Sequence, residues 1–355
     1  MAYTVVLAET DAHREALARI WKTNAYDPAV NPYARERFDW LYREPAVDKA
    51  QTWLAIETAS QAVIGCGSVF RSDRCFRGRR VAAGVPAVFF VEKEHRVAAA
   101  ALAIQRAVLA GGCRAGFDVV VAKPNRRARP ICDRVGYQPV TDLHDWYYVV
   151  AGDHVRMDLP DPARYTGEVV SAADERFDRL WERAHHRYPM AAEKTAAFLN
   201  WRYSGFKENY RFYCLVANDD GRLLGYVVFY AMKDGVVVTE LLADEPSGAV
   251  LENLLLGFCA QMKREEQVWV SLWYAGGTAF EDELQRIGFT RGTHQRTLLV
   301  YPNPEADAGF RREMLDRDNW FIFAGEMDVI LSDEVWRLDP EPEAGETNVA
   351  SAAVI

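Results

Sequence analysis

Apolar and polar residues alternate along the N-terminal part of the chain in a pattern that predicts helices, then a strand meander, then alternating helices and strands. The apolar run at 3–7 predicts a strand, and the helix after it places Leu17, Ile20 and Trp21 on one buried face. The pattern then predicts a helix at 34–42, strands at 52–56, 62–70 and 81–91, a helix at 98–109, a strand at 118–122, a helix at 128–135 and a strand at 146–150.

The same order of elements returns later in the chain. It predicts helices at 174–187 and 193–203, strands at 210–217, 223–230 and 236–243, a helix at 249–263, a strand at 267–273, a helix at 279–286 and a strand at 295–301. A meander followed by alternating helices and strands is typical of an α/β fold with a mixed sheet. It excludes a doubly wound parallel sheet.

Four pairs of sequence anchors support a duplication, since they recur in the same order about 150–160 residues apart. The pairs are Ile20-Trp21 with Leu180-Trp181, Asp39-Trp40-Leu41-Tyr42 with Asn200-Trp201-Arg202-Tyr203, Gly65 with Gly225, and Val135-Gly136-Tyr137 with Ile287-Gly288-Phe289. A period this long suits two globular units. We therefore predict two domains, copy one at 1–155 and copy two at 163–330.

Composition narrows the class of protein. The net charge of −9 argues against general nucleic-acid binding. Much of the acidic excess lies near the C-terminus, where 338–355 lacks aromatic residues and is predicted to be a disordered acidic tail. Six cysteines show no CxxC pair and the histidines no ligand spacing, which predicts reduced thiols and no bound metal. Without an export signal or an apolar run of about 18 residues, we expect a cytoplasmic protein that does not bind membranes.

Two stretches in copy one carry recognisable chemistry. Residues 89–102 predict a strand that enters a loop and then a helix, and the backbone N–H groups at such a helix start form a nest for anions. Residues 125–137 begin with Asn125 and end with Gly136-Tyr137. Together with the order of elements, these stretches resemble the GCN5-related N-acetyltransferase family. The resemblance covers residues 1–301 as two tandem copies.

The resemblance implies tandem acyl-CoA N-acyltransferase-like domains that use acetyl-CoA as co-substrate. In the family, a loop of the form Arg/Gln-x-x-Gly-x-Gly/Ala holds the pyrophosphate; here Arg96 takes its first position and Ala99 replaces a glycine. The implied cofactor-binding residues are Phe90, Val91, Arg96, Val97, Ala98, Ala99, Ala101, Asn125 and Arg126. Asn125 either bonds the pantetheine arm or caps the following helix. Cys132 stands where many members have a tyrosine acid, and we interpret it as a buried filler.

Copy two departs further from the family pattern. Its loop retains Gly248, but acidic residues surround that glycine and no arginine accompanies it, so we expect copy one to bind the cofactor. Glu240 lies on the strand where many members carry a general base, and its counterpart in copy one is Val88. Glu240 is therefore a candidate catalytic base or a water-facing strand residue. In copy one Glu92 and Glu94 are candidate bases or parts of a solvated loop.

Two further groups each allow two interpretations. Arginines at 71, 74, 77, 79 and 80 are expected either to bind an anionic substrate or the cofactor 3′-phosphate, or to form a solvated hairpin. A second group, Arg126, Arg127 and Arg129, is better placed than the first to bind the nucleotide end of the cofactor. The repeated pairs Trp40/Tyr42 and Trp201/Tyr203 favour core packing over an acceptor groove, because one substrate does not need both copies.

We therefore expect an N-acyltransferase that moves an acetyl or other short acyl group from coenzyme A to a primary amine, by direct attack on the thioester. The expected acceptor is a small molecule or sugar amine, and the protein is expected to be a monomer or homodimer. Two alternatives stay open: a non-catalytic tandem module that binds a ligand or partner, and an aminoacyl transferase of cell-wall synthesis.

Overall fold

The computed structural model describes residues 2–8, 13–24, 39–40, 50–96, 98–152, 158–204 and 210–327. Thirteen of the described strands form one mixed sheet that runs through both copies, and the other three form a small separate sheet. Copy one contributes β1 (Tyr3–Leu7), β2 (Gln51–Glu57), β3 (Val63–Arg71), β6 (Ala83–Val91), β7 (Val119–Ala122) and β8 (Gln138–Val149). Copy two contributes β9 (Tyr165–Val170), β11 (Arg211–Ala217), β12 (Leu223–Ala231), β13 (Gly235–Ala243), β14 (Trp269–Gly276), β15 (Thr290–Pro302) and β16 (Phe321–Phe323).

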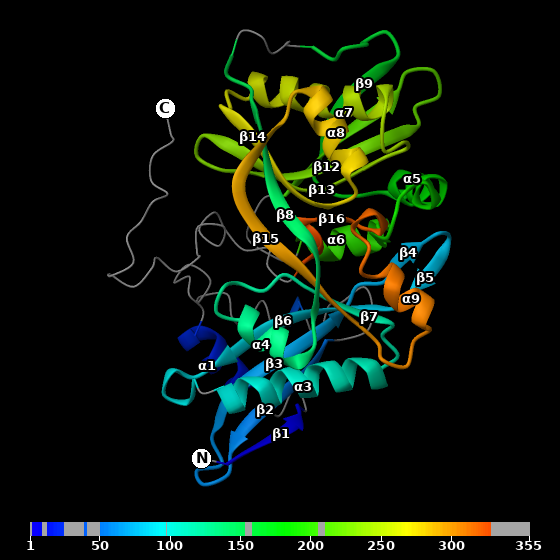
Figure 1. The fold of residues 1–355 in the computed structure, drawn as a ribbon. Helices are drawn as coiled ribbons and strands as arrows, with labels where there is room; N and C mark the ends of the chain where they lie inside the picture. Colours follow the sequence, from blue (N-terminus) through cyan, green and yellow to red (C-terminus); the bar gives the residue numbers. More distant parts are fainter. Residues whose placement is uncertain are drawn as a thin grey trace.

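Helices pack against the sheet in both halves (Figure 1). The described helices are α1 (Arg14–Asn24), α3 (Ala98–Arg114) and α4 (Arg129–Val135) in copy one, then α5 (Glu175–Ala184), α6 (Ala196–Ser204), α7 (Ala249–Arg264), α8 (Thr278–Ile287) and α9 (Ala308–Glu313). The short elements are β4 (Arg74–Phe76), β5 (Arg79–Val81), β10 (Ala191–Ala192), η2 (Lys93–His95), η3 (His185–Arg187), η4 (Arg317–Asn319) and η5 (Ala324–Glu326). No helix among the described residues is long and apolar enough to span a bilayer.

The element order predicted from the sequence is confirmed in both copies, together with the α/β class and the mixed sheet. The predicted helix at 34–42 falls mainly outside the described residues, within which Asp39 and Trp40 are helical. The predicted tail at 338–355 also lies outside them. The arginine-rich stretch forms the β4–β5 hairpin, one of its two interpretations, whereas β9, α9 and β16 were not predicted.

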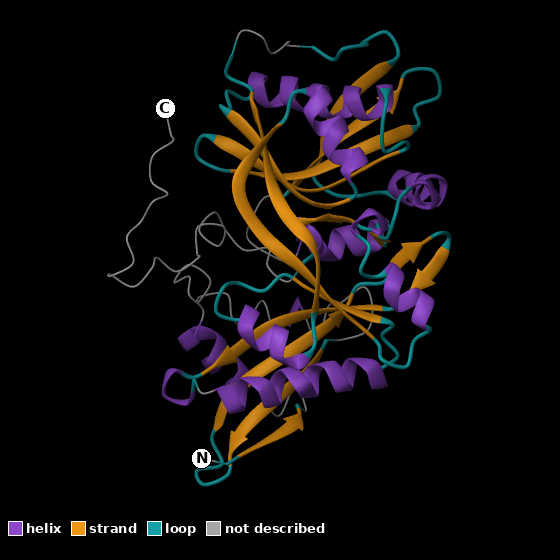
Figure 2. Cartoon of the chain, in the orientation of Figure 1, coloured by secondary structure: helices purple, strands orange, loops and turns teal. Residues whose placement is uncertain are grey.

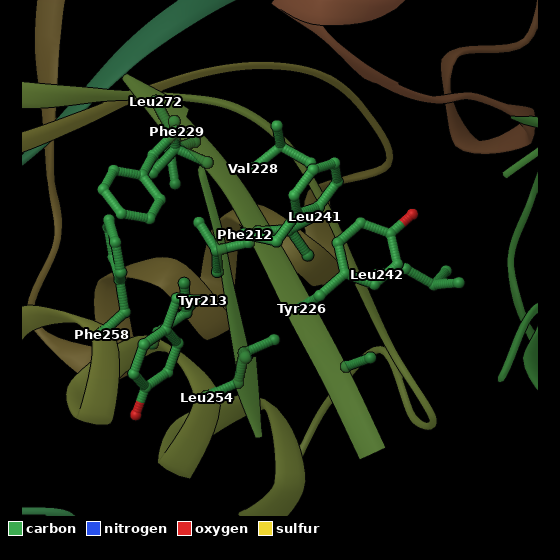
Figure 3. Packing of buried hydrophobic residues seen from close by; sticks show 14 of the residues in the cluster. Phe212, Tyr213, Tyr226, Val228, Phe229, Leu241, Leu242, Leu254, Phe258 and Leu272 are labelled. Carbon is green, nitrogen blue, oxygen red and sulfur yellow. The ribbon is translucent and has the colours of Figure 1, made fainter. Parts of the chain in front are cut away.

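The glycine anchors of the repeat play matched structural roles. A Cβ on Gly65 would meet Ile104 of α3 at 3.0 Å, and one on Gly225 would meet Leu254 of α7 at 2.9 Å. Each glycine therefore lets a helix pack closely on the middle of its sheet. In copy two, Leu254 and the neighbouring Phe258 lie on this face, and the Phe258 ring is 4.9 Å from that of Phe229 (Figure 3).

The last long strand of each copy crosses into the other copy. The sheet order is β7-β15-β8-β14, so β15 of copy two pairs with β7 of copy one, and β8 of copy one pairs with β14 of copy two. Figure 2 shows these two strands running from one half of the molecule into the other. The strand predicted at 295–301 lies within β15, whose partners β7 and β8 both belong to copy one. The domain bounds 1–155 and 163–330 remain a prediction, although the sheet does not stop at either.

A reciprocal tryptophan contact joins the copies at their centre. Trp40 and Trp201, which are equivalent in the repeat, stack with ring centroids 4.8 Å apart and planes 11° from parallel. The Trp40 indole N–H donates to the Trp201 carbonyl at 2.9 Å, and the Trp201 N–H donates to the Trp40 carbonyl at 3.2 Å. Such exchange of equivalent contacts is the geometry of a two-fold interface. It confirms the interpretation of these residues as packing groups.

Candidate functional site

The parallel strands β6 and β7 of copy one separate after a very short ladder. They pair only through Ala83 with Val119 and Gly84 with Val120 among the described residues. Pro86 follows on β6. The Ser72 N–H donates to the Ala83 carbonyl, which shows that the backbone N–H and C=O groups of odd-numbered residues in this part of β6 point toward β3. Pro86 thus faces β7, to which it can donate no hydrogen bond. Pro86 therefore cannot extend the ladder, and β6 and β7 are unpaired with each other beyond this point; we call this the V-shaped opening of copy one.

The β6 strand carries a bulge beside this opening. Pairing with β3 shifts by one residue between Cys66–Phe90 and Ser68–Ala87, which places Val88 in the bulge. Val88 is 2% exposed and has φ +53°, a left-handed conformation that is unfavourable for a β-branched residue. Strain of this kind costs about 1–3 kcal/mol and persists only where the surroundings impose it. The left-handed residue is therefore a feature of copy one, whereas a bulge also occurs in β13 of copy two, between the pairs Val228–Glu240 and Phe229–Val238.

The predicted phosphate loop connects this strand to α3. Arg96 follows η2, is exposed, and donates from Nε to the Val91 carbonyl at 3.1 Å. The first turn of α3 contains no acidic residue. Ala99 is helical and is absent from the positive-φ positions, so the alanine that replaces the family glycine is accommodated. Val97 lies outside the described residues.

The second predicted stretch forms the turn before α4. The Asn125 side-chain oxygen accepts from the Arg127 N–H at 3.1 Å and the Ala128 N–H at 2.9 Å, so Asn125 caps this turn. Arg126 and Arg127 are exposed at the same turn, whereas Arg129 pairs with Asp133 at 2.7 Å.

Cys132 on α4 is 5% exposed, and burial raises the pKa of its thiol to about 12. Its position in an apolar cluster agrees with the interpretation as a filler. Glu92 pairs with Arg19 of α1, while Glu94 is exposed on η2. Both carboxylates therefore stand at the end of β6, next to Val91.

In copy two, the equivalent helix start already holds a carboxylate. The Gly248 N–H at the start of α7 donates to Glu283 of α8 at 3.3 Å. Arg286 and this N–H together hold the pKa of the Glu283 carboxyl below its usual value. Arg187 bonds the Asp244 carbonyl at 2.7 Å and closes the preceding loop. An external anion would have to displace these internal partners.

The V-shaped opening of copy two is filled by the chain itself. β13 and β14 pair only as far as Val238 and Leu272, and β16 then pairs with the free part of β14, from Gly276 to Tyr274. The chain continues into η5, where a Cβ on Gly325 would lie 2.8 Å from the Thr239 carbonyl of β13. Residues 321–327 thus extend from β14 to β13 across the opening. We call this segment the plug.

Glu240 lies at the base of the plug in a closed ionic network. Its carboxylate bonds Lys194 at 2.6 Å and accepts from the Tyr203 hydroxyl. Lys194 also contacts Glu326 at 3.3 Å, and Glu326 bonds Arg74 of copy one at 2.9 Å. All four charged side chains are at most 2% exposed. Glu240 is thus not a water-facing strand residue, and its bonds to Lys194 and Tyr203 favour a structural role.

Most arginines of the stretch at 71–80 also form ion pairs within the chain. Four of its five arginines have carboxylate partners: Arg71 and Arg80 with Asp73, Arg74 with Glu326, and Arg77 with Glu313. The stretch forms the β4–β5 hairpin, which pairs with β10 and so ties copy one to copy two. It precedes β6, whereas Arg96 follows it, so the two basic groups lie at opposite ends of that strand.

Sequence reasoning missed the plug, Lys194 and Glu326. The run Phe321-Ile322-Phe323 was the available signal, because an apolar run beyond the last repeated strand needs a burial site. Among the described residues, no group of three or more His, Cys, Asp or Glu is arranged to hold a metal ion.

No sequence family and no curated protein matches this chain. Its fold, however, resembles that of a GCN5-related N-acetyltransferase from Anabaena variabilis, with a TM-score of 0.64 at 14% identity over 85% of this chain and 73% of that one. Saccharomyces cerevisiae N-myristoyltransferase with bound myristoyl-CoA gives 0.55 at 12% identity, over 93% and 86%. A tandem GNAT protein from the clavulanic acid biosynthesis pathway gives 0.56 at 12% identity, over 86% and 100%.

In each half of the molecule, two parallel strands separate next to the start of a helix. Together with these structural similarities, this arrangement defines an acyltransferase-type α/β fold. The chain has the GCN5-related N-acetyltransferase fold, in two tandem copies.

Proposed function

We propose that the protein is an acyl-CoA-dependent N-acyltransferase whose copy one holds the acyl-CoA. The contrast between the copies carries this proposal. In copy two, Glu283 occupies the helix start and the plug occupies the strand opening. In copy one, the described residues place no acidic side chain in the first turn of α3 and no strand between the separated parts of β6 and β7.

The charges around the copy one opening favour a phosphorylated ligand. Arg96 precedes α3, and Arg126 and Arg127 are exposed at the turn before α4. Backbone N–H groups of a helix start and nearby arginines suit the pyrophosphate and 3′-phosphate of coenzyme A. The separated edges of β6 and β7 suit the extended pantetheine arm, which carries amides that bond to a strand edge.

The proposed reaction transfers an acetyl or other short acyl group to a primary amine. The amine nitrogen attacks the thioester carbonyl, a C–N bond forms, the C–S bond breaks, and the coenzyme A thiolate takes up a proton. Glu92 and Glu94, at the end of β6, are the proposed acceptors for the amine proton, directly or through water. The proposed acceptor is a small-molecule or sugar amine, and the proposed state is a monomer or homodimer.

Calorimetric titration of acetyl-CoA into Arg96→Ala tests the placement of the cofactor. Loss of a charge-assisted hydrogen bond is worth about 1.5–3 kcal/mol, so we expect binding about 10- to 100-fold weaker than in the wild type. Arg187→Ala is the matched control, because Arg187 borders the corresponding loop of copy two. It should bind as the wild type does. A wild type that does not bind acetyl-CoA would leave the binding-module alternative, and equal losses in both variants would contradict a site in copy one.

A further inference from the structure

The bulge of copy one determines which face of the sheet each later residue of β6 occupies. Before the bulge, Val85 and Ala87 belong to the core cluster on the α1 side of the sheet. Val88 belongs to the same cluster, so the alternation of side chains slips by one residue there. Phe89 and Val91 then face the α3 side. Because strand side chains alternate with period two, loss of this slip would turn every later side chain to the opposite face.

The cluster that contains Val88 is built around residues of both copies. The stacked Trp40 and Trp201 rings contact Phe70 of β3, with centroids 6.3 Å and 6.2 Å away. The Arg202 guanidinium lies 5.3 Å from the Trp40 ring and 5.6 Å from the Phe70 ring. We call these three rings and this guanidinium the aromatic pile. Trp201 and Arg202 come from α6 of copy two, so the second copy packs against β3, the neighbour of the opening strand β6.

Val88 needs neighbouring side chains that hold it in its left-handed conformation. A β-branched residue leaves the left-handed region unless its surroundings prevent relaxation. The three rings of the pile are at most 7% exposed, and both indole N–H groups are fixed by bonds across the copy interface. The three rings and Val88 belong to one buried cluster on the α1 side of the sheet.

We propose that the aromatic pile positions Val88, so that copy two sets the conformation of the cofactor-binding strand in copy one. Trp201 is then a positioning residue that acts through Val88 and does not touch substrate. The proposal rests on the proposed function insofar as β6 borders the acyl-CoA site. Copy two then contributes to cofactor binding in copy one, although Glu283 and the plug occupy its own site.

A double-mutant comparison tests this coupling. Glycine adopts positive φ without strain, so Val88→Gly retains the bulge without needing the pile. We expect Trp201→Ala to weaken acetyl-CoA binding about 10-fold, Val88→Gly to change it by less than about threefold, and the double variant to bind more tightly than Trp201→Ala alone. A double variant whose loss is the product of the single losses would overturn the proposal.

A cofactor-free readout separates this inference from the proposed function. In valine-labelled protein, the Val88 Cα and Cβ chemical shifts report its backbone conformation. They should move toward extended values in Trp201→Ala and in the milder Trp201→Phe, which also removes the indole bond to Trp40. Phe258→Leu is the control, because it weakens the copy two core away from the pile. It should lower stability but leave both the Val88 shifts and acetyl-CoA affinity unchanged.

The outcomes are distinct. Unchanged Val88 shifts in both Trp201 variants would overturn the positioning role, whatever the protein binds. Moved shifts together with no acetyl-CoA binding by the wild type would retain the positioning role and contradict the proposed function. If Trp201→Ala does not fold, Trp201→Phe and its double variant with Val88→Gly decide the question.

Discussion

Lys194→Met is expected to lower the free energy of unfolding by about 3–5 kcal/mol, because it leaves buried carboxylates without their shared cation. In the wild type, Lys194 and Arg74 balance Glu240 and Glu326 in a region without solvent access. Methionine has a similar length but no charge. Chemical denaturation of the two proteins measures the difference directly.

Two controls show whether charge balance is the cause. Lys194→Met with Glu240→Gln removes one charge of each sign and should recover part of the loss. Arg179→Met breaks a pair with Glu175 whose side chains are 54% and 77% exposed, and should cost less than about 1 kcal/mol. Equal costs for Lys194→Met and Arg179→Met would contradict the network's role.

The same network gives wild-type stability a defined pH window. Burial opposes ionisation of Glu326, but Lys194 and Arg74 outweigh it, and the pKa of Glu326 lies below its ordinary 4.5. Its contribution is therefore present above pH 4.5 and is lost as the pH falls further. Burial likewise opposes the charge on Lys194, but Glu240 and Glu326 raise its pKa above 10.5. That contribution is present below pH 10.5 and is lost above it.

Neither half of the chain is expected to fold as a monomer when the chain is cut between Gly152 and Asp158. Fragment 1–157 would lack β15 beside β7, and fragment 158–355 would lack β8 beside β14. Each would expose an apolar strand edge, which favours aggregation or self-pairing. Co-expression should yield a one-to-one complex that binds acetyl-CoA. A soluble, cooperatively unfolding monomer of either fragment would contradict the strand exchange as a folding requirement.

Local features of the fold could be predicted because local patterns encode them. The helix faces of Leu17, Ile20 and Trp21, and the left-handed helix ends at Gly136 and Gly288, follow from periodicity and glycine chemistry. The strand exchange could not be predicted in this way. The alternation along β8 and β15 shows that each is a strand, but β7 and β14 offer equivalent edges, and only the three-dimensional arrangement selects between them.

The candidate site was partly predictable for the same reason. Charge along the two loops distinguished Arg96 in copy one from the acidic surroundings of Gly248 in copy two, where the Gly248 N–H already donates to Glu283. The ion pair of Glu240 could not be predicted, since a carboxylate within an apolar strand fits a general base as well as an ion pair. Its network joins Arg74 to Glu326, which lie 252 residues apart, so no local pattern predicts it.

Native mass spectrometry of the intact chain with excess acetyl-CoA counts the cofactor molecules bound and so tests whether copy one alone holds acetyl-CoA. We expect one acetyl-CoA per chain in the wild type and in Arg187→Ala, and a clear loss of that molecule in Arg96→Ala. Two molecules per chain would show that Glu283 and the plug do not close copy two. A single molecule that Arg96→Ala retains would place the cofactor outside copy one.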